Sequence, residues 1–221
     1  MEKGLVTEQD TGGLKLEFRK ADGYVAGVEA ITSRSNEFWR TLGRGVDAAA
    51  AHYGGADFAM AFGGNEMPGY HTGPAGYLGF MLGARHSHLD NAGYAIDQKE
   101  LTKGLIPAEQ LAQELMDEER WRQVLSSLTV CFFARGIYTP ELTLRALAAA
   151  GYNLTAEQLA ATADDIYRAK FAFKLANGFD FNKLTIPHRV FETPAVVSGF
   201  DEAYMRRAIA FAAGQLASPR A

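Results

Sequence analysis

The chain has 221 residues, of which 48% are apolar, and its formal net charge is −4. This composition can build a sizeable core, and it argues against a disordered chain and against a protein that binds DNA or RNA by charge. The longest apolar stretches fall far short of the roughly 20 residues that a membrane-spanning helix requires. The first residues lack an apolar secretory signal, and the single cysteine permits no internal disulfide, so we expect a soluble cytoplasmic protein with no nucleic-acid or membrane partner.

Five segments carry helix start and stop signals, and we therefore expect an all-α fold. These segments are residues 35–53, capped by Ser35; 107–131, starting at Pro107; 139–151, starting at Thr139-Pro140; 155–178, starting with a Thr155/Gln158 capping box; and a last helix capped by Asp201. In the fourth segment, helical spacing predicts an apolar face at Leu159, Ala163, Ile166, Lys170 and Phe173. We expect two helical subdomains, residues 1–100 and 101–221.

Two further segments, residues 63–93 and 179–199, fit neither a helical nor a strand pattern. The first is rich in glycine, which allows a backbone to approach a ligand closely or to take positive φ. The second contains Pro187 and Pro194, which interrupt a helix. Neither is expected to be a linker, and the first is expected to be a loop in close contact with a ligand.

The run Arg85-His86-Ser87-His88-Leu89-Asp90 places two imidazoles, a cation and a carboxylate within six residues. Such groups serve as metal ligands or as general acids and bases near neutral pH. A metal site here needs at least one further ligand from elsewhere in the chain. The alternative is that these side chains hydrogen-bond to the loop backbone, which is the common role of polar loop residues.

Cys131 follows an apolar run, and a lone cysteine in such a place is usually a small buried hydrophobic residue. An iron–sulfur cluster normally takes four thiolates, so Cys131 can contribute to one only if the others come from another segment or another chain. Glu66 has glycines before it and Pro68 after it, and is either a functional acid or a turn residue. No phosphate-binding loop, dinucleotide-binding fingerprint or serine-hydrolase motif is present.

Several motifs follow one another in a fixed order. Residues 62–70 read Phe-Gly-Gly-Asn-Glu-Met-Pro-Gly-Tyr, residues 85–88 Arg-His-Ser-His, residues 126–131 Ser-Ser-Leu-Thr-Val-Cys, and residues 186–189 Ile-Pro-His-Arg. Together they resemble the C-terminal half of the aldehyde:ferredoxin oxidoreductase family, enzymes with a tungsten or molybdenum pterin and a nearby [4Fe–4S] cluster. The corresponding family motifs are Lys-Gly-x-Glu-x-Pro-x-Tyr, Arg-Gly-x-x-His, Asp-x-x-Gly-Leu-Cys and Pro-x-Arg.

The resemblance assigns two of these motifs to the cofactors. It implies that Cys131 is the fourth cysteine ligand of the [4Fe–4S] cluster, and that Arg85, Ser126 and Thr129 lie at the pterin. Two residues depart from the family motif: Ser126 stands where the family has the pterin-contacting aspartate, and Thr129 stands where it has glycine.

The resemblance also implies the chemistry. Glu66 and His88, with His86 as the alternative histidine, would polarise substrate or water or transfer protons near the metal. The paired pterins and the other three cluster cysteines, in a Cys-x-x-Cys-x-x-x-Cys motif, would be held by an N-terminal half or a companion subunit. Joined to it, the chain would oxidise an aldehyde to a carboxylic acid and pass electrons to ferredoxin, whereas alone it would be inactive. The alternative is a catalytically inactive helical scaffold or partner-binding domain.

Overall fold

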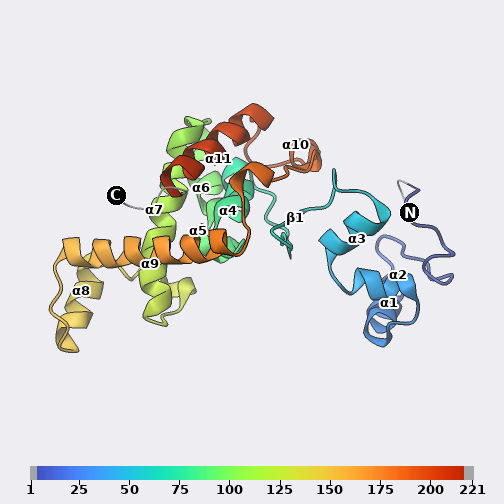
Figure 1. Ribbon diagram of the computed structural model, residues 1–221, viewed down its shortest axis with the longest axis horizontal. Helices are drawn as coiled ribbons and strands as arrows, with labels where there is room; N and C mark the ends of the chain where they lie inside the picture. The colour runs from blue at the N-terminus through green and yellow to red at the C-terminus, as the bar shows by residue number, and fades with distance from the viewer. Residues whose placement is uncertain (1–3, 217–221) are drawn as a thin grey trace. The chain divides into compact units, whose positions relative to one another are not determined.

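The computed structural model describes residues 4–216 (Figure 1). Within this range the regular elements are helices apart from one short antiparallel hairpin, so the predicted all-α class is confirmed. None of the helices in the described range is long and apolar enough to cross a membrane. The chain forms two compact units, Met1–Met67 with Ile186–Glu192 and Pro68–Thr185 with Thr193–Ala221. The expected division into subdomains at residue 100 stays a prediction.

The first unit packs around a buried tryptophan. Trp39 donates a hydrogen bond from its indole Nε1 to the carbonyl oxygen of Thr11, over 3.1 Å, and its ring lies against Gly27. The elements of this unit are α1 (Ala21–Ser33), α2 (Glu37–Leu42), α3 (Val46–Tyr53), the hairpin of β1 (Ala61–Phe62) and β2 (Asn65–Glu66), and α10 (Arg189–Glu192).

The single helix predicted over residues 35–53 was wrong, because α2 and α3 are separate helices. Gly45 has a φ of 102°, a conformation that interrupts a helix and that glycine adopts readily. The cap is Asn36 rather than Ser35, since the Asn36 side chain accepts a hydrogen bond from the amide of Trp39. The predicted end at Gly54 is confirmed, while α1 carried no signal that we recognised.

The second unit is built around α4, whose nine residues are all buried. The neighbouring helix α6 approaches it so closely that a Cβ on Gly93 would lie 1.9 Å from the carbonyl oxygen of Ala75. Asp97 of α6 accepts hydrogen bonds from the amides of Ala75 and Gly76 and so caps the start of α4. The helices are α4 (Pro74–Leu82), α5 (His88–Asn91), α6 (Gly93–Lys99), α7 (Ala108–Ser127), α8 (Pro140–Ala149), α9 (Ala156–Ala176) and α11 (Glu202–Leu216), with 3-10 turns at Leu101–Lys103, Phe132–Ala134 and Phe181–Lys183.

Three predicted helix starts in this unit are confirmed. The Thr139 hydroxyl caps α8, Thr155 and Gln158 form the predicted capping box of α9, and Asp201 accepts a hydrogen bond from the amide of Tyr204 at the start of α11. Pro107 is the cap of α7 rather than its first residue. The long helices α7 and α9 cross each other and are in contact (Figure 1).

Two other predictions for this unit were wrong. Residues 63–93 are not one loop, because they contain β2, α4 and α5; a helix that is buried all round has no polar face, so α4 shows no helical periodicity. The predicted face of α9 was right at Leu159 and Ala163, which are buried, and wrong beyond them. Phe173 is 72% exposed, and the buried face continues through Tyr167 and Phe171 instead.

Candidate functional site

The segment Gly83–Asp90 joins α4 to α5 and carries three of the candidate residues, Arg85, His86 and His88. It is attached to two long helices by charged side chains. The amide of Ala84 donates to Oε1 of Glu119 on α7 over 2.8 Å, and Nζ of Lys174 on α9 donates to the carbonyl oxygen of Gly83 over 2.7 Å.

Asp90 organises the same segment from within. Its carboxylate is fully buried and accepts hydrogen bonds from the amides of Arg85 and Ser87 and from Nε of Arg85, the last over 2.7 Å. Ser87 in turn caps α5 in a capping box with Asp90. The Arg85 guanidinium is therefore held in an ion pair, with about half of its side chain exposed.

His86 points into the protein interior. Its Nδ1 lies 2.9 Å from the carbonyl oxygen of Phe80, and because a carbonyl only accepts, Nδ1 carries the proton. Burial, with a further contribution from the Lys174 charge, lowers the pKa of His86 to about 4, so the ring is neutral at pH 7. This geometry favours the structural alternative for His86, that of a histidine hydrogen-bonded to backbone.

His88 is half-buried beside an aromatic group. The centroid of its ring lies 5.1 Å from that of Tyr70, and Tyr70 is stacked on Tyr94 at 4.8 Å. The pKa of His88 lies below its ordinary value because of burial. The nearby Asp90 opposes this shift, and the Arg122 charge adds to it. A neutral imidazole at the surface of an aromatic group can accept or return a proton, so His88 is the better placed of the two histidines for acid–base chemistry.

The last turn of α7 and the residues after it carry the other candidates of this unit. Ser126 is half-buried and Thr129 is exposed, with its hydroxyl donating to the carbonyl oxygen of Leu128. Thr129 has a φ of 56°, which a β-branched residue rarely adopts. The left-handed turn that glycine would favour is therefore present although the glycine is not.

Cys131 is exposed, so the alternative of a buried hydrophobic cysteine was wrong. Large apolar side chains around it are exposed too, with Phe133 at 98% and Ile137 at 64%. Among residues 4–216, no group of three or more histidine, cysteine or acidic side chains could hold a metal ion. An exposed cysteine nevertheless fits a cluster ligand whose partner cysteines come from outside the chain.

Arg122 connects the histidine segment to the cysteine segment. It lies on α7 with only 3% of its surface exposed, and its Nη1 donates to the carbonyl oxygen of Leu89 over 3.0 Å. Its guanidinium also lies over the ring of Phe132, at 5.5 Å from the centroid. One buried side chain thus contacts the neighbour of His88 and the neighbour of Cys131.

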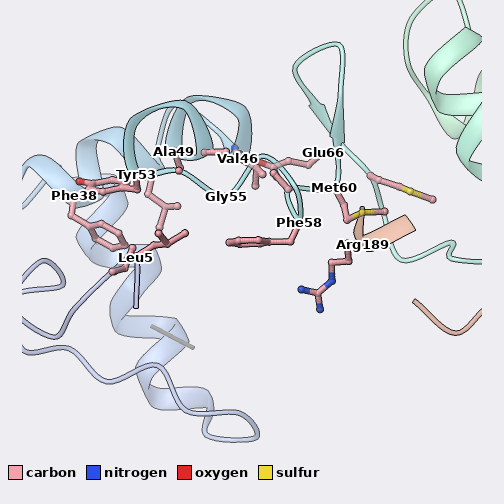
Figure 2. A pocket seen from close by; sticks show the side chains of 16 residues that line it. Leu5, Phe38, Val46, Ala49, Tyr53, Gly55, Phe58, Met60, Glu66 and Arg189 are labelled. Carbon is pink, nitrogen blue, oxygen red and sulfur yellow. Dashed lines mark hydrogen bonds between the residues drawn. The ribbon is translucent and has the colours of Figure 1, made fainter. Parts of the chain in front are cut away.

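Glu66 belongs to the first unit, whereas the other six candidate residues belong to the second. Its Oε1 accepts a hydrogen bond from the amide of Val46 over 2.8 Å, which satisfies a free donor at the start of α3. Figure 2 shows it at one side of a cavity of about 570 Å³. The cavity walls are mostly apolar, from Phe38, α3 and Phe58, and its charged lining residues are Glu66 and Arg189.

Sequence reasoning missed Glu119, Arg122 and Lys174, which shape the histidine segment. A signal was available, because Glu119 and Arg122 continue the helical spacing of Leu111 and Leu115 on the buried face of α7. A charged residue at such a position is rarely buried without a partner.

Comparison with known proteins identifies the family of the chain. The family model for aldehyde ferredoxin oxidoreductase, domains 2 and 3, matches residues 1–209. The chain belongs to this family. No curated protein and no solved structure gave a match. The match covers both Glu66 and the segments of His88 and Cys131, so the candidate residues all lie in the part of the chain that is shared with the family.

Proposed function

We propose that the chain is the C-terminal part of an enzyme that oxidises an aldehyde to a carboxylic acid and passes the electrons through a [4Fe–4S] cluster to ferredoxin. The reaction takes the form RCHO + H₂O → RCOOH + 2 H⁺ + 2 e⁻. A bound tungsten or molybdenum pterin would supply the two-electron chemistry, and the cluster the one-electron transfers to the acceptor. The observation that carries the proposal is the family match together with the exposed thiol of Cys131.

The chain's own residues would hold the cofactors and transfer protons. Cys131 would ligate the cluster through its thiolate, while Ser126 and the Thr129 turn would contact the pterin. Arg85 would face it with an orientation fixed by Asp90. These roles require a companion polypeptide or N-terminal half that holds the pterins and three further cluster cysteines.

Proton transfer would fall to His88 and Glu66. Because burial lowers the pKa of His88, its imidazole is neutral at pH 7 and can accept one of the two protons that the reaction releases. Glu66, an acid at the rim of an apolar cavity, would polarise the substrate or water. His86 would have no direct part, because its Nδ1–H is engaged with the Phe80 carbonyl.

Co-expression tests this function. The chain would be produced anaerobically with a polypeptide that carries the pterin-binding domain and the Cys-x-x-Cys-x-x-x-Cys motif, and the complex analysed for iron, tungsten, molybdenum and aldehyde-dependent ferredoxin reduction. We expect about four irons per complex, loss of most of this iron in Cys131→Ser, and no loss in the control Ser127→Ala. A wild-type complex without iron, tungsten or molybdenum would instead favour the inactive scaffold.

A further inference from the structure

The peptide group between Gly83 and Ala84 is held from both sides by ionisable side chains. Its carbonyl oxygen accepts from Nζ of Lys174 at 2.7 Å, and its N–H donates to Oε1 of Glu119 at 2.8 Å. The two side chains come from different helices, α9 and α7, and each is far from the peptide in sequence. A single backbone unit at the end of α4 is therefore fixed in position and in rotation.

The remainder of the segment is fixed in the same way. Asp90 accepts from the amides of Arg85 and Ser87, and Arg122 donates to the carbonyl oxygen of Leu89. His88 lies between these fixed points, as the first residue of α5. Its position thus depends on buried charged groups on either side of it in the chain.

Holding these groups in the interior is costly, which points to a purpose beyond stability. Glu119 is 1% exposed, and burial, with the nearby Asp90, raises its pKa to about 8, although Lys174 and Arg85 oppose the shift. Burial also lowers the pKa of Lys174 to about 8, although the nearby Glu119 and Asp90 raise it. Apolar side chains of similar size often stabilise a fold as well as buried ionisable groups do.

We propose that Glu119 and Lys174 are positioning residues for His88, which fix the Gly83–Ala84 peptide and thereby orient the imidazole against Tyr70 and Tyr94. The inference rests on the proposed function only for what His88 then does. The placement itself concerns this chain alone, so it can fail while the oxidoreductase function stands, or hold while that function fails.

Four variants of the full chain test the placement by NMR. Glu119→Leu removes the acceptor for the Ala84 amide, Glu119→Gln keeps an oxygen acceptor, and Lys174→Met removes the donor to Gly83. Glu114→Gln is the matched control, because Glu114 lies on the same helix and accepts a hydrogen bond from Gln110 one turn away. The readouts are hydrogen exchange of the Ala84 amide, and the titration and ring-current shift of the His88 imidazole.

In Glu119→Leu and Lys174→Met we expect the Ala84 amide to exchange with solvent at least about tenfold faster. Local opening of this peptide group then breaks one of its two side-chain hydrogen bonds instead of both. The His88 pKa should move back toward its ordinary value, and its ring protons should lose the shift caused by Tyr70. Glu119→Gln should restore the wild-type values, since it keeps the acceptor without a charge. Glu114→Gln should change neither readout.

The inference would be overturned if Glu119→Leu or Lys174→Met lowered the stability of the fold but left the His88 titration and ring-current shift as in the wild type. Should Glu119→Leu not fold, Lys174→Met gives the same comparison from the other side of the peptide. In a reconstituted active complex we expect Lys174→Met to lower kcat about tenfold with KM nearly unchanged, as a displaced proton-transfer group would. A higher KM with kcat unchanged would contradict a positioning role.

Discussion

Acid destabilises the second unit through His86, and replacing His86 with asparagine should remove this effect. The imidazole is 8% exposed, and burial lowers its pKa from 6.5 to about 4. The unfolded chain therefore binds a proton between these two values that the folded chain does not bind. The resulting stability is fully present above the unfolded pKa and is lost as the pH falls through the folded pKa.

The size of the effect follows from the shift. A fall in the pKa from 6.5 to about 4 corresponds to about 3 kcal/mol at the acid limit. At pH 5 the loss relative to pH 7 is about 2 kcal/mol, because His86 in the unfolded chain is then almost fully protonated. Such a loss is a substantial part of the stability of an ordinary domain.

His86→Asn is the suitable change for two reasons. Asparagine tolerates the positive φ of 51° at this position, and its amide nitrogen can take the place of Nδ1 as a donor to the carbonyl oxygen of Phe80. The matched control is His52→Asn, because His52 is exposed on α3 in the other unit.

Urea unfolding followed by far-ultraviolet circular dichroism measures the free energy of unfolding at pH 7 and pH 5. The difference between the two values should be smaller by about 2 kcal/mol in His86→Asn than in the wild type, and unchanged in His52→Asn. The reasoning is refuted if His86→Asn retains the wild-type dependence, or if the C2 proton of His86 titrates near its ordinary pKa in the folded protein.

Three substitutions follow from the backbone and its caps. Thr129→Gly should stabilise the chain by about 1 kcal/mol, measured by urea unfolding, because it relieves the positive φ of a β-branched residue; Thr129→Ala should give no such gain. Gly93→Ala should cost more than about 3 kcal/mol, or prevent folding, since its Cβ would meet the carbonyl oxygen of Ala75. Glu66→Ala should cost about 1 kcal/mol by thermal melting through the lost contact with the Val46 amide, and Glu66→Gln less.

The sequence predicted well those features that depend on a few neighbouring residues. The caps at Thr139, Thr155 and Asp201 are local hydrogen bonds between a side chain and the amide three residues on, so their chemistry can be read directly from the chain. The break between α2 and α3 was readable in principle, from the paired glycines at Gly43 and Gly45, but the apolar spacing across them concealed it.

Features that depend on distant contacts could not be predicted in this way. Helix α4 has no polar face because other helices of its unit surround it, and its cap, Asp97, comes from α6. His86 and His88 are two residues apart in sequence, yet one is enclosed by the interior and the other lies against tyrosines. The two histidines can therefore be assigned different roles only from their surroundings in the fold, and not from their positions in the sequence.

Helix α7 fixes both candidate centres of the second unit. Its Glu119 holds the end of α4, its Arg122 holds the carbonyl of Leu89 and the ring of Phe132, and its last turn leads directly to Cys131. Glu119 and the last residue of the helix, Ser127, lie about two turns apart, so His88 and the thiol that would ligate the cluster are connected through one short stretch of α7. A substitution that frays its C-terminal turn should disturb both at once, whereas one confined to α8 should disturb neither.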